Sequence, residues 1–284
     1  MIVDAHHHLW DPARRDYPWM TGDAAALRRP IGLGDLRAAV EPLGVGATVA
    51  VQAASTEEET VELLALAAAS GGLVAGVVGW IDLTAPDAGE RLASLESAPG
   101  GERLVGIRHA VHDEPDPGWL DRDDVVRGLR AVARAGLPYD LLLFPEHIEA
   151  ATRVAASAPE LALVVDHGAK PRIAAGEREP WSSDLAALAA HEQVHCKLSG
   201  LVTEADRDGW REQDVAAYGE RLLELFGPER LMFGSDWPVC TLAASYAEVL
   251  DLAHSVVAPL NAGEQEAVLA GTARRFYGLD GEDG

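Results

Sequence analysis

Short apolar segments rich in Val, Ile and Leu alternate along the chain with longer segments that have helical spacing. The apolar segments are continuous, as is typical of strands covered on both faces. They predict strands at residues 2–5, 47–52, 73–80, 104–108, 139–144, 161–166, 194–198 and 231–234. The segments between them predict helices at residues 33–43, 57–70, 88–97, 121–135, 146–158, 184–190, 213–226 and 245–257.

This strand–helix alternation predicts an α/β protein with a parallel sheet and right-handed crossovers. Eight such units favour a closed (β/α)8 TIM barrel, with an open doubly wound sheet as the alternative. No Gly-rich nucleotide-binding motif follows the first predicted strand. No linker divides the chain, so we expect one domain over residues 1–280 and a disordered tail at 281–284.

One helix start carries a recognisable signal. Thr56 precedes the second predicted helix and Glu59 follows three residues later, which predicts a capping box. Gly71 and Gly72 predict the end of the same helix.

The charge of the chain narrows the classes of partner. The 23 Lys and Arg residues against 46 Asp and Glu residues give a net charge of −23. Such a surface repels phosphate backbones and anionic lipids, so we expect neither nucleic-acid nor membrane binding. Two cysteines form no disulfide framework, and no apolar run is long enough for a membrane span. We therefore expect a soluble cytoplasmic protein with a small-molecule substrate; a homo-oligomer stays open.

Candidate catalytic and metal-binding residues follow the predicted strands at their carboxyl ends, where a barrel has its active site. His6 and His8 come after the first strand and alternate onto one side, with His7 on the other. Two imidazoles on one side can bind one divalent metal or one anionic substrate. The alternatives are a partial purification tag, which the surrounding apolar strand argues against, and capping histidines.

Other strands end in residues of the same kind. The fourth ends in Arg108-His109, the sixth is followed by His167, and the eighth by Asp236. Any one of them alone is weak evidence, because strand-end histidines and aspartates often have structural roles. Their joint placement predicts that four metal-compatible side chains meet at one mouth: His6, His8, His167 and Asp236.

These motifs resemble the amidohydrolase superfamily. They are DAHHHLWD at residues 4–11, GIRH at 106–109, DHGAKP at 166–171, CKLSGL at 196–201 and FGSDWP at 233–238. More narrowly, they resemble its lactone-hydrolase branch of fuconolactonases and similar sugar lactonases, with pyrone-dicarboxylate and muconolactone-type hydrolases as relatives. The resemblance extends to residues 271–277 and implies a (β/α)8 fold with His6, His8, His167 and Asp236 in the active site.

One departure from the superfamily bears on the metal. Binuclear members carry a bridging Lys or Glu on the fourth strand and a His on the fifth, where this chain has Arg108 and Phe144. We therefore expect at most one divalent ion. Zinc held by His6, His8 and Asp236, with His167 nearby, is the expected choice. Metal-independent activity, with the imidazoles as direct donors, stays open.

A lactone hydrolase needs an activated water, a polarised carbonyl and protonation of the leaving oxygen. Asp236 is the candidate general base. The carbonyl would be polarised by His6, His8 and His167, directly or through a metal. The alcohol oxygen of an ester leaves more readily than the amine nitrogen of an amide. One metal or none therefore suffices, which favours a lactone over an amide.

Further residues at the same mouth are candidates for binding the substrate: Arg108, His109, Lys197, Trp10 and Trp237. Arg108 has a fork that matches a carboxylate or two sugar hydroxyls, and indoles can lie against a sugar ring. The alternatives are packing for the tryptophans and an ion pair with Asp166 for Lys197. Few cations near the mouth favour a neutral, sugar-derived lactone over a dicarboxylate.

Two other functions stay open from the sequence. A related amidohydrolase branch uses a similar histidine pair and aspartate with a metal to decarboxylate aromatic acids. A barrel that has lost its chemistry and only binds a ligand is the non-enzymatic alternative. The identity of the lactone cannot be predicted from these motifs.

Overall fold

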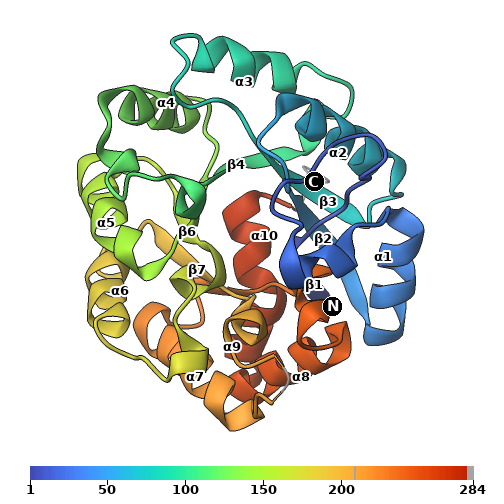
Figure 1. The fold of residues 1–284 in the computed structure, drawn as a ribbon, viewed down its shortest axis with the longest axis vertical. Helices are drawn as coiled ribbons and strands as arrows, with labels where there is room; N and C mark the ends of the chain where they lie inside the picture. The colour runs from blue at the N-terminus through green and yellow to red at the C-terminus, as the bar shows by residue number, and fades with distance from the viewer. Residues whose placement is uncertain (208, 280–284) are drawn as a thin grey trace.

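The computed structural model describes residues 1–207 and 209–279, which form a barrel of eight parallel strands (Figure 1). The strands follow one another around the sheet in chain order. They are β1 (Ile2–His7), β2 (Val45–Val51), β3 (Val74–Gly79), β4 (Leu104–Ala110), β5 (Tyr139–Leu142), β6 (Leu163–Val165), β7 (Val194–Leu198) and β8 (Leu231–Phe233). The predicted (β/α)8 fold is confirmed.

The sheet closes where the chain after β8 meets β1. The Asp236 amide donates to the His6 carbonyl over 2.8 Å, and the His8 amide donates to the Trp237 carbonyl over 2.7 Å. His7 and Trp237 form a parallel bridge. The open-sheet alternative is therefore wrong, and residues from the two ends of the barrel sequence become neighbours.

Helices form a ring outside the strands (Figure 1). They are α1 (Leu33–Val40), α2 (Glu57–Ala69), α3 (Ala88–Glu96), α4 (Asp123–Arg134), α5 (Ile148–Ser157), α6 (Trp181–Ala189), α7 (Glu212–Phe226) and α8 (Tyr246–Val257). No helix in residues 1–207 and 209–279 combines the length and the apolar composition needed to cross a membrane. The predicted disordered tail, residues 281–284, lies outside the described residues.

A helical segment that the strand–helix alternation did not predict follows α8. It comprises α9 (Ala262–Glu266), a π-helical turn (Ala267–Gly271) and α10 (Thr272–Tyr277). Ala273 and Tyr277 pack with Val3 and Val49 in a buried cluster. The Tyr277 hydroxyl also donates to Asp140, the second residue of β5. Helix α10 therefore covers the amino-terminal end of the strands, opposite the predicted mouth.

Element boundaries differ from the prediction where polar residues are buried. Strand β1 continues to His7, because the imidazoles lie inside the protein. The predicted cap on α2 is half right: the Thr56 hydroxyl accepts from the Glu59 amide over 3.2 Å. The Glu59 carboxylate, however, accepts from the Ala53 and Ala54 amides. The capping box is therefore wrong, and Glu59 instead fixes the loop that leaves β2.

Candidate active site

Strand β1 supplies two imidazoles to the mouth of the barrel. His6 and His8 lie on the same side, while the His7 ring turns away and contacts Thr48 Oγ1 at 2.9 Å. The Nδ1 of His8 lies 2.7 Å from the Val51 carbonyl, which can only accept a hydrogen bond. His8 therefore carries a proton on Nδ1, and its Nε2 faces the mouth, where it is the nitrogen available to a ligand in the neutral ring.

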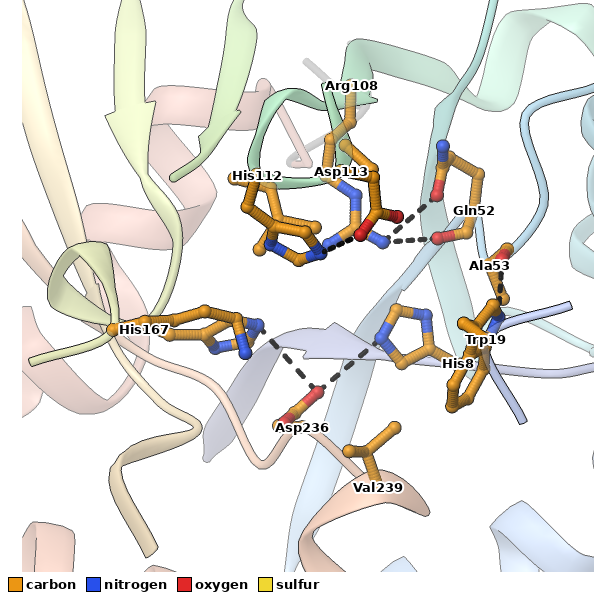
Figure 2. A pocket seen from close by; sticks show the side chains of 13 residues that line it. His8, Trp19, Gln52, Ala53, Arg108, His112, Asp113, His167, Asp236 and Val239 are labelled. Carbon is orange, nitrogen blue, oxygen red and sulfur yellow. Dashed lines mark hydrogen bonds and ion pairs between the residues drawn. The ribbon is translucent and has the colours of Figure 1, made fainter. Parts of the chain in front are cut away.

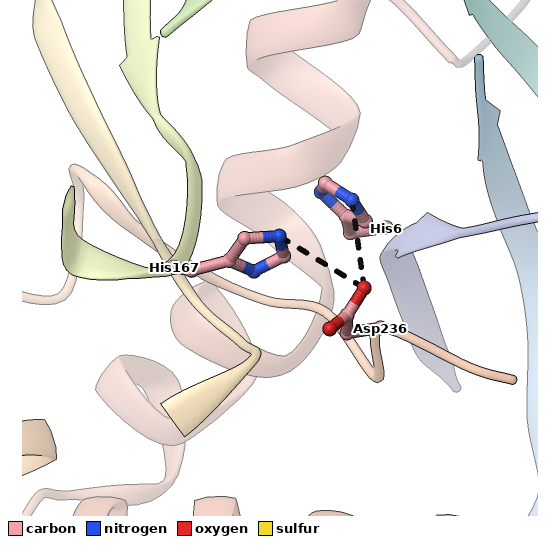
Figure 3. Close-up of side chains that lie close together, drawn as sticks. All are labelled: His6, His167 and Asp236. Atoms are coloured by element: carbon pink, nitrogen blue, oxygen red, sulfur yellow. Dashed lines mark ion pairs between the residues drawn. The ribbon is translucent and has the colours of Figure 1, made fainter. Parts of the chain in front are cut away.

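His167 and Asp236 reach the mouth from unusual backbone conformations. Their φ angles are +55° and +56°, in the left-handed region that residues with a Cβ seldom adopt. Such a conformation costs of order 1–3 kcal/mol and persists where the surroundings enforce it, often at functional sites. Here it brings the His167 ring and the Asp236 carboxylate together with His6 (Figure 3).

The four predicted side chains converge. His6, His167 and Asp236 each offer one ligand atom, and these atoms all lie within 4.8 Å of one another. Nε2 of His8 lies 3.3 Å from Nε2 of His6 and 3.5 Å from Oδ1 of Asp236. All four residues are at least 95% buried, with exposures of 0%, 5%, 3% and 3% for His6, His8, His167 and Asp236.

The protonation states suit a metal ion. Burial lowers the pKa of His167 to about 4 and that of His6 well below its usual value, so both rings are neutral near pH 7. Burial opposes ionisation of Asp236, but the His167, His8 and His6 side chains outweigh it and lower the pKa of the carboxyl. Neutral imidazoles beside a carboxylate are the donors that zinc prefers.

The spacing of the donors points the same way. Two nitrogens bound to one tetrahedral zinc at about 2.0–2.1 Å lie roughly 3.3 Å apart, which is the observed separation of the His6 and His8 Nε2 atoms. The residues present therefore fit a single divalent ion.

Gly200 allows the His167 ring to lie against the backbone. A Cβ at Gly200 would come within 2.4 Å of His167 Nδ1, and the residue has a φ of +62°. The ring cannot easily move away, because its Nδ1 is already 2.8 Å from Ser199 Oγ.

Gly200→Ala should therefore displace His167 and lower kcat/KM more than tenfold, besides costing about 1–2 kcal/mol of stability for the left-handed alanine. Gly136→Ala is the matched control, since Gly136 has a φ of +73° and a Cβ added there would meet nothing within 4 Å. Steady-state kinetics and urea denaturation of both variants check this. Equal activity of the two variants would contradict the role given to Gly200.

Lys197 does not reach the mouth, contrary to its predicted role in substrate binding. Its side chain is fully buried, and Nζ lies 2.6 Å from Asp140 and 2.9 Å from Asp166. Burial alone would raise the pKa of Asp166, but the Lys197 ammonium, His6 and Arg108 together outweigh burial, and the pKa lies well below its usual value. The alternative of an ion pair with Asp166 is what the structure contains.

Arg108 lies at the bottom of the pocket with its fork already occupied. Nη1 donates to Asp166 over 2.9 Å and lies 3.3 Å from His6 Nε2, and Nη2 donates to the Gln52 side chain over 3.0 Å. Nη2 also donates to the Gln52 carbonyl. The guanidinium can contact a substrate at its edge, but it does not offer a free bidentate fork to a carboxylate.

The other three predicted substrate contacts lie outside the cavity lining. Trp10 is 4% exposed and donates to the Leu27 and Arg29 carbonyls, so it packs behind the mouth. Trp237 is also buried, and its backbone closes the barrel. His109 accepts from Trp80 Nε1 over 3.0 Å and contacts Glu114 at 2.7 Å. All three side chains therefore pack or form hydrogen bonds within the protein, and the predicted contacts with the substrate are wrong.

A cavity of about 200 Å³ opens over the convergent side chains (Figure 2). Its lining adds residues that the sequence patterns did not indicate, chiefly Trp19, Gln52 and Asp113. Gln52 ends a predicted strand and could have been selected by position, whereas Trp19 lies in a turn and Asp113 ends a short 3-10 helix (Val111–Asp113). The complete lining is His8, Trp19, Gln52, Ala53, Arg108, Ala110, His112, Asp113, Leu142, His167, Lys170, Asp236 and Val239.

Comparison with known proteins identifies the family. The sequence model of the amidohydrolase family matches residues 3–279. An L-fucono-1,5-lactonase of Burkholderia multivorans is 40% identical over 98% of this chain and 96% of its own length, and one of Burkholderia ambifaria is 40% identical over 87% and 83%. A crystal structure of an amidohydrolase from Burkholderia multivorans with bound zinc superposes with a TM-score of 0.90 at 38% identity, covering 98% of this chain and 99% of that one. The chain thus belongs to the amidohydrolase family and is a hydrolase of that family.

Proposed function

We propose that this protein hydrolyses the ester ring of a small sugar-derived lactone, with a six-carbon aldonolactone of the L-fucono-1,5-lactone type as the expected substrate. The observation that carries the proposal is the convergence of three imidazoles and one carboxylate at the mouth of a cavity. Two relatives at 40% identity named L-fucono-1,5-lactonase support the choice of substrate.

The metal in this proposal is a single zinc ion. His6, His8 and Asp236 would hold it, with His167 beside them, since their donor atoms lie within reach of one centre. When bound, the ion supplies Lewis-acid polarisation of the lactone carbonyl.

Asp236 performs the proton transfers. Its low pKa keeps it as a carboxylate near neutral pH, ready to accept a proton from a water molecule. The water oxygen bonds to the carbonyl carbon, and the ring carbon–oxygen bond then breaks. Asp236 returns the proton to the leaving oxygen, so that the lactone and one water become one hydroxy acid.

The other residues orient the reactants. Because the Nδ1 of His8 is held by the Val51 carbonyl, the neutral ring cannot donate a hydrogen bond from Nε2. Arg108 lines the cavity with Nη1 3.3 Å from His6 Nε2, so this donor can stabilise negative charge on the carbonyl oxygen. In a metal-independent reaction the Arg108 guanidinium would therefore stabilise the negative charge on the carbonyl oxygen.

The size of the cavity agrees with a single sugar ring. Its volume of about 200 Å³ lies below the range of roughly 300–1,000 Å³ that drug-sized ligands occupy. Apolar Leu142, Ala110 and Val239 line it together with polar Gln52 and His112. This mixture suits a small ring that carries hydroxyls and an apolar face.

A panel of five- and six-carbon aldonolactones, followed with a pH indicator, tests the proposal. We expect acid release with at least one six-carbon lactone, well above spontaneous hydrolysis. Protein purified without a histidine tag should contain about one zinc per chain, and activity should fall after treatment with a chelator and return with zinc. No acid release from any lactone of the panel, or release of CO2 from a hydroxybenzoate in its place, would overturn the proposed function.

A further inference from the structure

Two cations line the cavity, and each is neutralised by a carboxylate. Arg108 is paired with Asp166, as described above. Lys170 lies at the rim, with Nζ 2.8 Å from Glu204 Oε1. Both members of this second pair are mostly buried, with side-chain exposures of 19% and 20%. Each cation of the cavity lining therefore already has a carboxylate partner.

The position of Lys170 is imposed by the backbone. His167, Ala169 and Lys170 all have positive φ angles, of 55°, 60° and 49°. This left-handed turn follows β6 and brings both the His167 ring and the Lys170 side chain to the same cavity. The Gly168 carbonyl in the turn accepts a hydrogen bond from Trp181 Nε1 over 2.7 Å. The turn thus places Lys170 at the rim through a strained backbone conformation, and Glu204 neutralises its charge there.

A third charge at the rim is negative. Asp113 lines the cavity and lies 3.3 Å from His112 Nε2. The hydrogen bond from His112, followed by the charges of neighbouring residues including Lys170, lowers the pKa of Asp113. Asp113 is therefore ionised near neutral pH and adds a repulsive charge for any anion that enters.

We propose that the Lys170–Glu204 ion pair determines the specificity of this site, by making the rim accept uncharged hydroxylated lactones and reject carboxylates. The inference rests on the proposed function and extends it to the product. Ring opening turns a neutral lactone into a hydroxy acid, whose carboxyl group loses its proton to solvent near neutral pH. A rim without a free cation does not hold that anion, so Glu204 promotes release of the product as well as exclusion of anionic lactones.

Glu204→Gln should free the Lys170 ammonium to bind a carboxylate. We expect the affinity for six-carbon aldonates, measured by isothermal titration calorimetry, to rise about tenfold relative to wild type. Adding Lys170→Met in the same chain should remove this gain, because the gain comes from the coupling between the two side chains. In steady-state assays the product inhibition constant should fall by the same factor.

Glu229→Gln is the matched control, since Glu229 pairs with Arg275 on the exposed surface and is absent from the cavity lining. It removes the same charge and should leave aldonate affinity unchanged. The inference is overturned if Glu204→Gln binds aldonates no better than wild type, if it binds none detectably, or if Glu229→Gln gains equally. Aldonate binding is measured without turnover, so the two proposals fail separately. Failure of the wild type to hydrolyse any lactone would contradict the proposed function. Unchanged aldonate affinity in Glu204→Gln would contradict the role of the Lys170–Glu204 ion pair.

Discussion

Replacing Asp236 with asparagine is expected to lower kcat/KM for the lactone by about 10²–10⁴-fold. The amide has the shape of the carboxylate but cannot take a proton from water or return one to the leaving oxygen. The side chain lies 3.5 Å from His8 Nε2 and 3.9 Å from His6 and His167 Nε2, so no other carboxylate in the cavity lining can take its place without moving. Steady-state kinetics with the best lactone of the panel measure the loss.

Two controls separate proton transfer from other effects of Asp236→Asn. Metal content, measured on the same preparation, distinguishes loss of the base from loss of a ligand, and addition of zinc should not restore activity. Circular dichroism should show an unchanged fold. An Asp236→Asn variant that keeps its zinc and more than a tenth of the wild-type kcat/KM would contradict the role of general base.

Replacing Lys197 with methionine is expected to destabilise the protein by about 3–5 kcal/mol, because it leaves the buried Asp140 carboxylate without a cation. Asp140 and Asp166 both contact Nζ, and all three side chains have exposures of 0%. Burial already raises the pKa of Asp140 to about 6 in the presence of the ammonium. Urea denaturation at neutral pH measures the change in unfolding free energy.

Partner variants keep this prediction testable if Lys197→Met folds poorly. Asp140→Asn combined with Lys197→Met should recover part of the stability, because it removes the carboxylate left without a cation, while Asp166 keeps its ion pair with Arg108. Tyr277→Phe removes only the 2.7 Å hydrogen bond to Asp140 and should cost about 1 kcal/mol. A loss below 1 kcal/mol in Lys197→Met would mean that Lys197 is not the cation that stabilises this cluster.

The barrel could be predicted from the sequence because each strand is a continuous apolar run separated from the next by a helix. That pattern has a local cause, since strands covered on both faces need apolar side chains at every position. The closing helix α10 has no such signal: it follows the last strand–helix unit and covers the amino-terminal end through contacts such as Tyr277 with Asp140. A contact between residues so far apart along the chain leaves no periodicity to detect.

The site was predictable where position along a strand decides the direction of a side chain. His6 and His8 alternate to one side of β1, and Asp236 and His167 follow strands that end at the same mouth. Lys197 satisfies the same positional rule, yet buried carboxylates on β5 and directly after β6 bind its ammonium. Neither the partner of a buried charge nor a loop residue such as Trp19 can be inferred from position alone.

Attack of a water molecule on the carbonyl carbon of a lactone is the central step proposed for this site, and an isotope experiment tests it most directly. The reaction is run to partial conversion in ¹⁸O-labelled water, and the product is fragmented in a mass spectrometer. We expect one labelled oxygen in the carboxyl group and none in the hydroxyl released from the ring. Label in that hydroxyl, or product formed without label, would contradict this step.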